Sequence, residues 1–137
     1  MRARRMIQLV LVWVALSAAQ CNPIATTTDI TGAWGGEHIA LTVTDTGSSI
    51  EYDCAHGSIA GPIHPGEDGR FAATGVHYRE HGGPIREGEL PDAHPASYSG
   101  RITGDKMSLV VRETDTRNEI GTFTLARGAD ARVLKCL

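Results

Sequence analysis

The sequence predicts an all-β domain, a small antiparallel barrel or a sandwich, preceded by a signal peptide. Apolar and polar residues alternate with a period of two along most of the chain, as half-buried strands require. No stretch of twelve residues has the period of an amphipathic helix, and many of the 16 glycines lie in short turns between the alternating segments. Short strands joined by glycine-rich turns are typical of antiparallel barrels and sandwiches.

The first 20 residues predict export. Arg2, Arg4 and Arg5 form a basic start, and residues 6–19 are almost all apolar. That run is shorter than the about 20 residues that a membrane-spanning helix needs. A basic start, a short apolar run and small residues after it form a secretory signal. Ordinary cleavage after Ala19 would give a secreted or periplasmic protein.

Residues 18–21, Ala-Ala-Gln-Cys, resemble a bacterial lipobox, in which the cysteine becomes the lipidated first residue. The chain has three cysteines, and exported domains usually pair theirs. If Cys21 carries a lipid, Cys54 and Cys136 remain as one pair. We therefore expect lipidation at Cys21, which would anchor the protein to the bacterial cell membrane or outer membrane, and a disulfide between Cys54 and Cys136.

The charge of the exported chain excludes two classes of partner. Residues 1–20 hold three arginines and no acidic residue, so their removal lowers the net charge from −3 to −6. An acidic chain lacks the basic face that nucleic acids need, and it does not bind anionic lipid by charge. The remaining length suits one domain, which we place at residues 32–137 after a polar tether at residues 21–31.

Two alternating segments, residues 38–45 and 49–57, lie in the first part of the domain. A turn at residues 45–47 separates them. Their apolar positions are Ile39, Leu41, Val43, Ile50, Tyr52 and Cys54. This phase predicts that Cys54 lies on a strand and on its apolar face. A further turn at residues 66–69 precedes a segment in which Phe71 and Ala73 face the same way.

The clearest hairpin spans residues 97–113. Gly104-Asp105 suits a two-residue type II′ turn, which places Thr103 opposite Lys106. This register sorts the side chains onto an apolar and a polar face, which supports the pairing. The apolar face comprises Tyr98, Ile102, Met107, Leu109 and Val111. The last predicted strand covers residues 119–128, with Phe123, Leu125 and Arg127 in phase.

The two ends of the domain resemble the lipocalin-like (calycin) barrels. Gly32-Ala33-Trp34 opens the first strand, and Arg127 lies on the last. In that family a Gly-x-Trp motif supplies a tryptophan that plugs the closed end of the barrel, and an arginine stacks over it. The resemblance implies that Trp34 is the plug and that Arg127 covers it. The chain as a whole also resembles small uncharacterised bacterial envelope lipoproteins.

Residues 77–95 hold three histidines, His77, His81 and His94, which are candidate metal ligands. Their spacing matches no specific metal motif, because the glycines and proline at 82–84 prevent a helix there. We expect a strand that ends near residue 79 and then an ordered, exposed loop over residues 80–96. A loop of that length is usually functional. Its candidate recognition residues are Gly82, Gly83, Pro84, Ile85 and Arg86.

No catalytic motif is present in the sequence. Gly-x-Ser-x-Gly, phosphate-loop and dinucleotide patterns are absent, and we interpret Glu51 and Asp53 as a solvated strand face near His56. We therefore expect a non-enzymatic, cofactor-free binding protein of the cell envelope, whose partner is a protein or a small molecule. Two alternatives stay open, an inhibitor of an envelope or extracellular enzyme and a metal-binding protein that uses the loop histidines.

Overall fold

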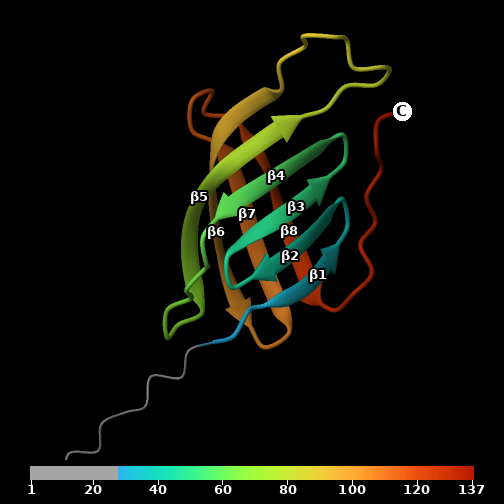
Figure 1. Cartoon of the computed structure of the whole chain (residues 1–137). Helices are drawn as coiled ribbons and strands as arrows, with labels where there is room; N and C mark the ends of the chain where they lie inside the picture. Colours follow the sequence, from blue (N-terminus) through green and yellow to red (C-terminus); the bar gives the residue numbers. More distant parts are fainter. Residues whose placement is uncertain (1–27) are drawn as a thin grey trace, which may run out of the picture.

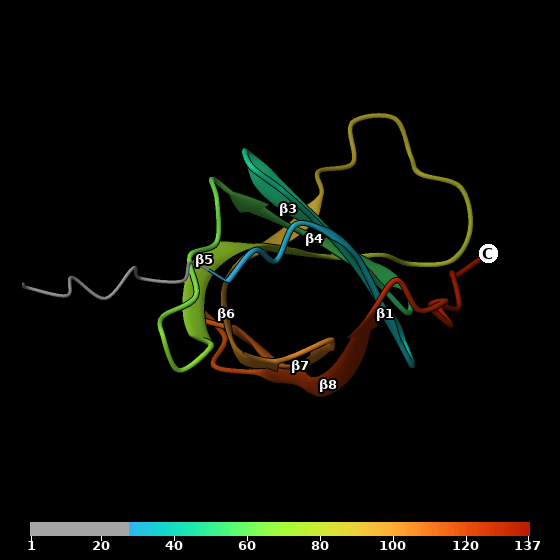
Figure 2. The same cartoon turned by 90° about the horizontal axis from the view of Figure 1, so that it is seen from below.

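A computed structural model describes residues 28–137 and shows eight antiparallel strands that form a closed barrel (Figures 1 and 2). This confirms the all-β prediction. The predicted signal peptide and Cys21 lie outside the described residues. Residues 28–137 contain no helix long and apolar enough to cross a membrane. The strands are β1 (Gly32–Gly36), β2 (Ile39–Thr44), β3 (Gly47–Tyr52), β4 (Ala55–Ala60), β5 (Arg70–Arg79), β6 (Asp92–Thr103), β7 (Lys106–Glu113) and β8 (Glu119–Arg127).

Each strand pairs with the next in the sequence, and β1 pairs with β8 to close the barrel, with Trp34 opposite Arg127. Most large apolar residues of the strands point inward, because successive side chains alternate between the two faces; Val110, between the buried Leu109 and Val111, faces outward. The interior is filled over most of its length, as expected for an eight-stranded barrel of this size. The largest fully buried side chains include Trp34, Tyr98, Ile39, Ile50, Met107, Leu109 and Leu125.

The predicted β6–β7 hairpin is confirmed. Thr103 pairs with Lys106, and Gly104 has a φ of 59°, as the first position of a type II′ turn requires. The apolar face that the register predicts is buried, with Tyr98 and Val111 fully inaccessible. Opposite Tyr98, Gly57 leaves room for the tyrosine hydroxyl, since a Cβ there would lie 2.5 Å from it.

The prediction that Cys54 lies on a strand face is wrong. β3 ends at Tyr52, and β4 begins at Ala55, so Cys54 lies in a tight turn with a φ of 51°. The polar–apolar alternation continues through Asp53 and Cys54, and it therefore conceals the reversal of the chain. The turn places Cys54 at the end of the barrel where the C-terminal segment lies.

The predicted loop is shorter than expected, because β6 begins at Asp92 rather than after Ala96. Its ladder with β5 includes Val76 opposite Pro95. The Pro95 carbonyl accepts from Thr114, on the β7 side of the strand. Because the N–H and C=O of one residue face the same neighbour, the missing N–H of Pro95 also faces that side, beyond the end of the β6–β7 ladder. The proline therefore costs no ladder bond to β5.

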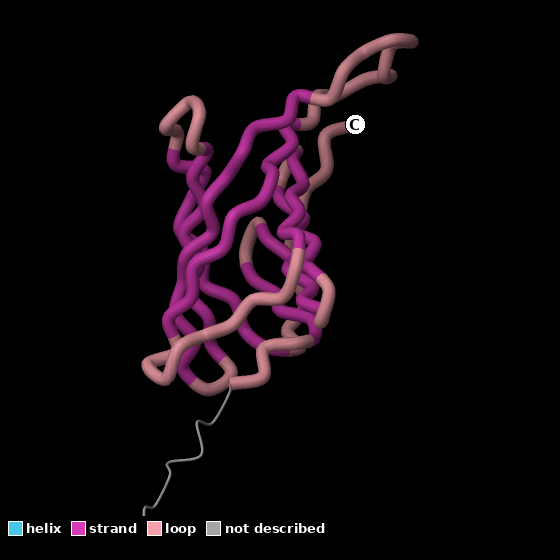
Figure 3. Tube along the Cα trace, turned by 60° about the vertical axis from the view of Figure 1, so that its left-hand side comes forward, coloured by secondary structure: helices cyan, strands magenta, loops and turns pink. Residues whose placement is uncertain are grey.

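The two ends of the barrel differ. The described chain enters at one end, whereas the loop over residues 80–91 and the C-terminal residues lie at the other (Figures 1 and 3). The turns that follow β1, β3 and β7 also lie at this second end. We call the first end the plugged end and the second the open end.

Candidate functional site

Trp34 and Arg127 close the plugged end. Trp34 is 1% exposed, and its indole Nε1 donates to the Ile30 carbonyl at 2.9 Å. The Arg127 guanidinium carbon lies 4.4 Å from the centre of the indole ring, within cation–π range. Arg127 also donates to the carbonyls of Thr31 and Asp29. Residues 29–31, assigned from the sequence to the tether, are therefore bound to the barrel.

The open end holds a pocket of about 420 Å³, which we call the mouth pocket. Its size lies within the roughly 300–1,000 Å³ of small-molecule sites. The strand ends that surround it bring polar and apolar groups together. Its lining includes Tyr52, Ala55, His77, Arg79, Ile120 and Phe123.

A buried carboxylate organises the polar side of this end. Glu113, the last residue of β7, has a fully buried side chain. It accepts hydrogen bonds from His77 Nδ1 at 3.0 Å, from Arg79 Nε at 2.9 Å and from Thr116 Oγ1 at 2.5 Å. A second bond from Arg79 makes the guanidinium contact bidentate.

These donors keep Glu113 ionised. Burial alone would raise the pKa of the carboxyl group, but the hydrogen bonds from Thr116, Arg79 and His77 outweigh burial and lower the pKa to about 2. An ionised carboxylate can only accept hydrogen bonds, so His77 Nδ1 must carry a proton. In the neutral imidazole the other nitrogen, Nε2, is then an acceptor.

Two polar atoms beneath the mouth pocket remain without a partner. Neither His77 Nε2 nor the Tyr52 hydroxyl has a hydrogen bond of good geometry among residues 28–137, although both atoms are buried. The Tyr98 hydroxyl lies beside that of Tyr52 but donates to the Val76 carbonyl at 2.9 Å. The rings of Tyr52 and His77 pack edge to face with centroids 5.4 Å apart, and Phe123 packs against Tyr52 at 5.7 Å. Buried polar atoms normally have partners, so such a pair marks a functional candidate.

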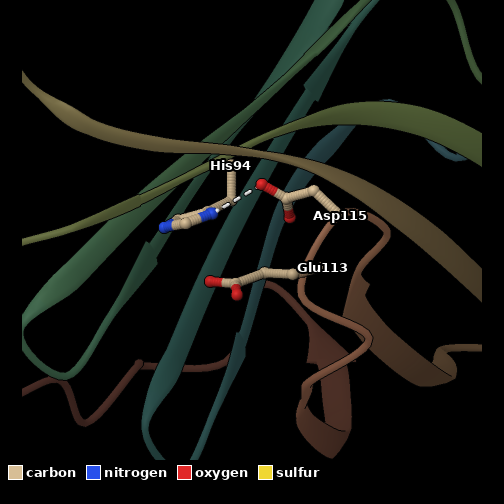
Figure 4. Close-up of side chains that lie close together, drawn as sticks. All are labelled: His94, Glu113 and Asp115. Carbon is tan, nitrogen blue, oxygen red and sulfur yellow. Dashed lines mark hydrogen bonds and ion pairs between the residues drawn. The ribbon is translucent and has the colours of Figure 1, made fainter.

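The possible metal ligands that the structure brings together are His94, Glu113 and Asp115, whose ligand atoms lie within 4.8 Å of one another. Figure 4 shows His94 bonded to Asp115, with Glu113 beside them. Both ring nitrogens of His94 are engaged, by Asp115 at 2.8 Å and by Asp92 at 2.9 Å. Arg79 already neutralises Glu113, so a cation here would have to displace an arginine. The donor set does not favour a metal.

The three candidate metal ligands from the sequence occupy different settings. His77 lies on β5 beside Glu113, and His94 lies opposite it on β6. His81 lies in the loop, where it bonds Glu89 and the Gly82 carbonyl. The expectation that His94 belongs to the loop is therefore wrong, since β6 begins two residues earlier.

The candidate recognition residues Gly82, Gly83, Pro84, Ile85 and Arg86 are all exposed. Ile85 is 81% exposed and Leu90 is 86% exposed. The loop is braced internally, because Glu89 accepts from the Arg86 amide at 3.0 Å and donates its own amide to the Arg86 carbonyl at 3.0 Å. A groove of about 450 Å³ lies beneath it, between the loop and Cys136.

The predicted disulfide joins Cys54 to Cys136, with Cα atoms 4.9 Å apart. It fastens the C-terminal segment to the open end of the barrel. The Cys54 amide donates to the Leu134 carbonyl at 3.1 Å, and the Leu134 amide donates to Asp53 at 2.7 Å. Lys135 pairs with Glu51 and Glu80. Glu51 and Asp53 therefore hold this segment and are not merely solvated.

Histidine–carboxylate pairs surround the open end. Five of the six histidines pair with an acidic residue, and every pair lies at this end. Several pairs join separate elements. His38 joins the β1–β2 turn to Asp53, His56 joins β4 to Glu80, and His94 joins β6 to the β7–β8 connection through Asp115.

These pairs predict that the loop over residues 80–91 loosens as the pH rises from 5.5 to 8.5. The Gly82 carbonyl and Glu89 raise the pKa of His81 above 6.5, and Asp115 raises that of His94. Because the pKa of each histidine is higher in the folded protein than in the unfolded chain, its ion pair stabilises the fold fully below about pH 6.5. This stabilisation is lost as the pH rises through the pKa of the folded protein. The Arg86 amide and His81 lower the pKa of Glu89, and His94 lowers that of Asp115. Both carboxylates therefore stay ionised between pH 5.5 and 8.5.

Amide hydrogen exchange, corrected for the intrinsic effect of pH, measures this loosening. Protection of residues 80–91 should decrease toward pH 8.5, and His81→Gln should reduce that dependence. The β6–β7 turn at Gly104 and Asp105 lies at the plugged end and serves as an internal control. Loop protection that is equal at both pH values would contradict the expectation.

Sequence reasoning missed Glu113, Arg79 and Tyr52 as members of the site. The signal for Glu113 was present, because it lies two residues after Val111 and therefore falls on the apolar face of its strand. Arg79 follows His77 by the same spacing on β5. A charged residue in phase with a core face indicates a buried network.

The fold defines a closed eight-stranded antiparallel barrel, which is compatible with a lipocalin-like barrel. Comparisons with protein-family models, with curated proteins and with solved structures find no match to this chain.

Proposed function

We propose that this chain is an exported, lipid-anchored binding protein of the bacterial cell envelope, with a lipocalin-like barrel that takes a small molecule into its mouth pocket. The observation that carries the proposal is the unpartnered, buried His77 Nε2, which lies with the Tyr52 ring beneath a pocket with apolar walls. Binding sites of this kind combine apolar walls with a few polar groups that orient the ligand.

The mouth pocket is favoured over the groove beneath the loop. The histidines and carboxylates of that groove already have partners, since His56 bonds Glu80, His81 bonds Glu89 and Asp92 bonds His94. A ligand there would have to compete with these ion pairs for most of the polar side chains. At the mouth pocket a ligand can satisfy buried atoms, which removes a penalty of about 1–3 kcal/mol for each.

Binding is favoured over catalysis. Among the described residues, the lining of the mouth pocket includes no serine, threonine, lysine or free cysteine, which are the usual nucleophiles. Cys54 is held in the disulfide, and Asp53 is held by His38 and the Leu134 amide. The His77–Glu113 pair thus has no nucleophile of these types to activate.

The lipid anchor at Cys21 agrees with the placement of the mouth pocket. The described chain begins at the plugged end (Figure 3), so an anchor on the preceding segment would leave the open end directed away from the membrane. Mass spectrometry of the protein isolated from bacterial membranes should show an acylated Cys21. An unmodified cysteine in that material would contradict the anchor.

Titration with the neutral fluorophore N-phenyl-1-naphthylamine tests the pocket. We expect enhanced emission with the wild-type protein and at least tenfold weaker binding to Ile120→Trp, because the larger side chain fills the pocket. Thr122→Trp is the matched control, since Thr122 lies two residues away on the same strand and is exposed. Equal affinity for both variants, or no binding to the wild type, would contradict the proposed site.

A further inference from the structure

The floor of the mouth pocket specifies the chemistry of the group that meets it. His77 donates from Nδ1 to the ionised Glu113, so Nε2 is an acceptor in the neutral form of the ring. The two nitrogens of an imidazole point in different directions, and Glu113 therefore does not satisfy Nε2. A ligand that pairs with Nε2 must supply an O–H or N–H donor.

Tyr52 adds the complementary requirement. Its hydroxyl is buried beside the Tyr98 hydroxyl, and burial raises its pKa, so the group stays protonated and can direct its hydrogen to Tyr98 or to a ligand. The Tyr52 ring contacts the His77 ring edge to face, which keeps the two side chains adjacent. A single hydroxyl group on a ligand can donate to Nε2 and accept from the Tyr52 hydroxyl.

The charges around the mouth pocket are already paired. Arg79 forms a bidentate pair with Glu113, and His38 pairs with Asp53. A charged ligand group would lose its water at the floor without gaining an unpaired opposite charge, which is costly. The walls supplied by Ala55, Ile120 and Phe123 suit an apolar ring.

We infer that the ligand is a neutral cyclic alcohol or phenol, whose ring lies against Ile120 and Phe123 and whose hydroxyl group pairs with His77 Nε2 and Tyr52. This inference rests on the proposed function, because it names the class of ligand for the same pocket. Glu113 acts as a positioning residue, since it sets which nitrogen of His77 carries the proton.

Isothermal titration calorimetry at pH 7 with three ligands of one shape tests the inference. 2-Naphthol can donate and accept a hydrogen bond, and 2-methoxynaphthalene can only accept one. Naphthalene can neither donate nor accept a hydrogen bond. We expect 2-naphthol to bind at least tenfold more tightly than 2-methoxynaphthalene, because the ether leaves Nε2 unpaired. His77→Leu should reduce this preference to about twofold or less, and Tyr52→Phe, which removes only the hydroxyl, should weaken 2-naphthol more than naphthalene.

The outcomes separate the inference from the proposed function. Equal affinity of the wild type for 2-naphthol and 2-methoxynaphthalene, or a preference that persists in His77→Leu, overturns the inference and leaves the pocket as a binding site. Failure of all three ligands to bind the wild type overturns both. Thermal unfolding shows whether His77→Leu folds. If it does not, the comparison of ligands on the wild type and on Tyr52→Phe decides the question.

Discussion

Replacing Cys54 and Cys136 together by serine should lower the free energy of unfolding by about 4.5 kcal/mol, the value of the chain-entropy model for this loop. The disulfide joins residues that are 82 positions apart, so its loss frees most of the chain in the unfolded state. Small domains are stable by about 5–15 kcal/mol in total. The serine variant should therefore be close to unfolding at ordinary temperature.

The contacts of the C-terminal segment give this variant a second readout. The His38 amide donates to the Arg132 carbonyl at 2.8 Å, and Lys135 donates to the Ala55 carbonyl at 3.2 Å. These bonds hold the segment without the disulfide, but only while the open end stays ordered. Hydrogen exchange in residues 132–137 should therefore accelerate more than in β6 and β7.

Urea unfolding followed by circular dichroism measures the loss. Both proteins should carry Cys21→Ser, so that no free thiol exchanges with the native pair. The reduced parent protein, with Cys54 and Cys136 intact, should lose the same stability as the serine variant. A loss below about 1 kcal/mol would mean that the disulfide constrains little of the unfolded chain, contrary to the entropy argument.

Local patterns made the strands and the β6–β7 hairpin predictable. In that hairpin the turn residues and the alternation act on the same short segment, and both point to one register. The reversal at Asp53 and Cys54 left no such signal. Asp53 is a residue type common in turns, but Cys54 is not, and the alternation of polar and apolar residues continues as far as Cys54.

The site was less predictable than the fold, because it depends on contacts between distant strands. His77 was singled out as a possible metal ligand, yet its partner Glu113 lies 36 residues away. Only the closure of the barrel places β5, β6 and β7 so that these side chains meet. The phase of Glu113 indicates burial, but the sequence alone does not show which donors satisfy it.

Trp34→Ala should lower the free energy of unfolding by about 3–5 kcal/mol, as other buried large aromatic residues do. The indole is 1% exposed, and its removal also leaves the Ile30 carbonyl without its donor and Arg127 without a ring beneath it. Trp34→Phe keeps an aromatic ring but loses the Nε1 donor, so its cost should be clearly smaller. Circular dichroism must follow unfolding, since Trp34 is the sole tryptophan of the chain after residue 20.

The position of Trp34 predicts that Trp34→Ala keeps its ligand binding. Trp34 pairs with Arg127 at the plugged end, whereas Ile120 and Phe123 line the mouth pocket at the other end of β8. Mutations at separated sites usually act independently. The folded fraction of Trp34→Ala should therefore bind N-phenyl-1-naphthylamine within about twofold of the wild type. A loss of stability below 1 kcal/mol would contradict the role of Trp34 as the plug. A loss of binding in the folded protein would show that the two ends of the barrel are coupled.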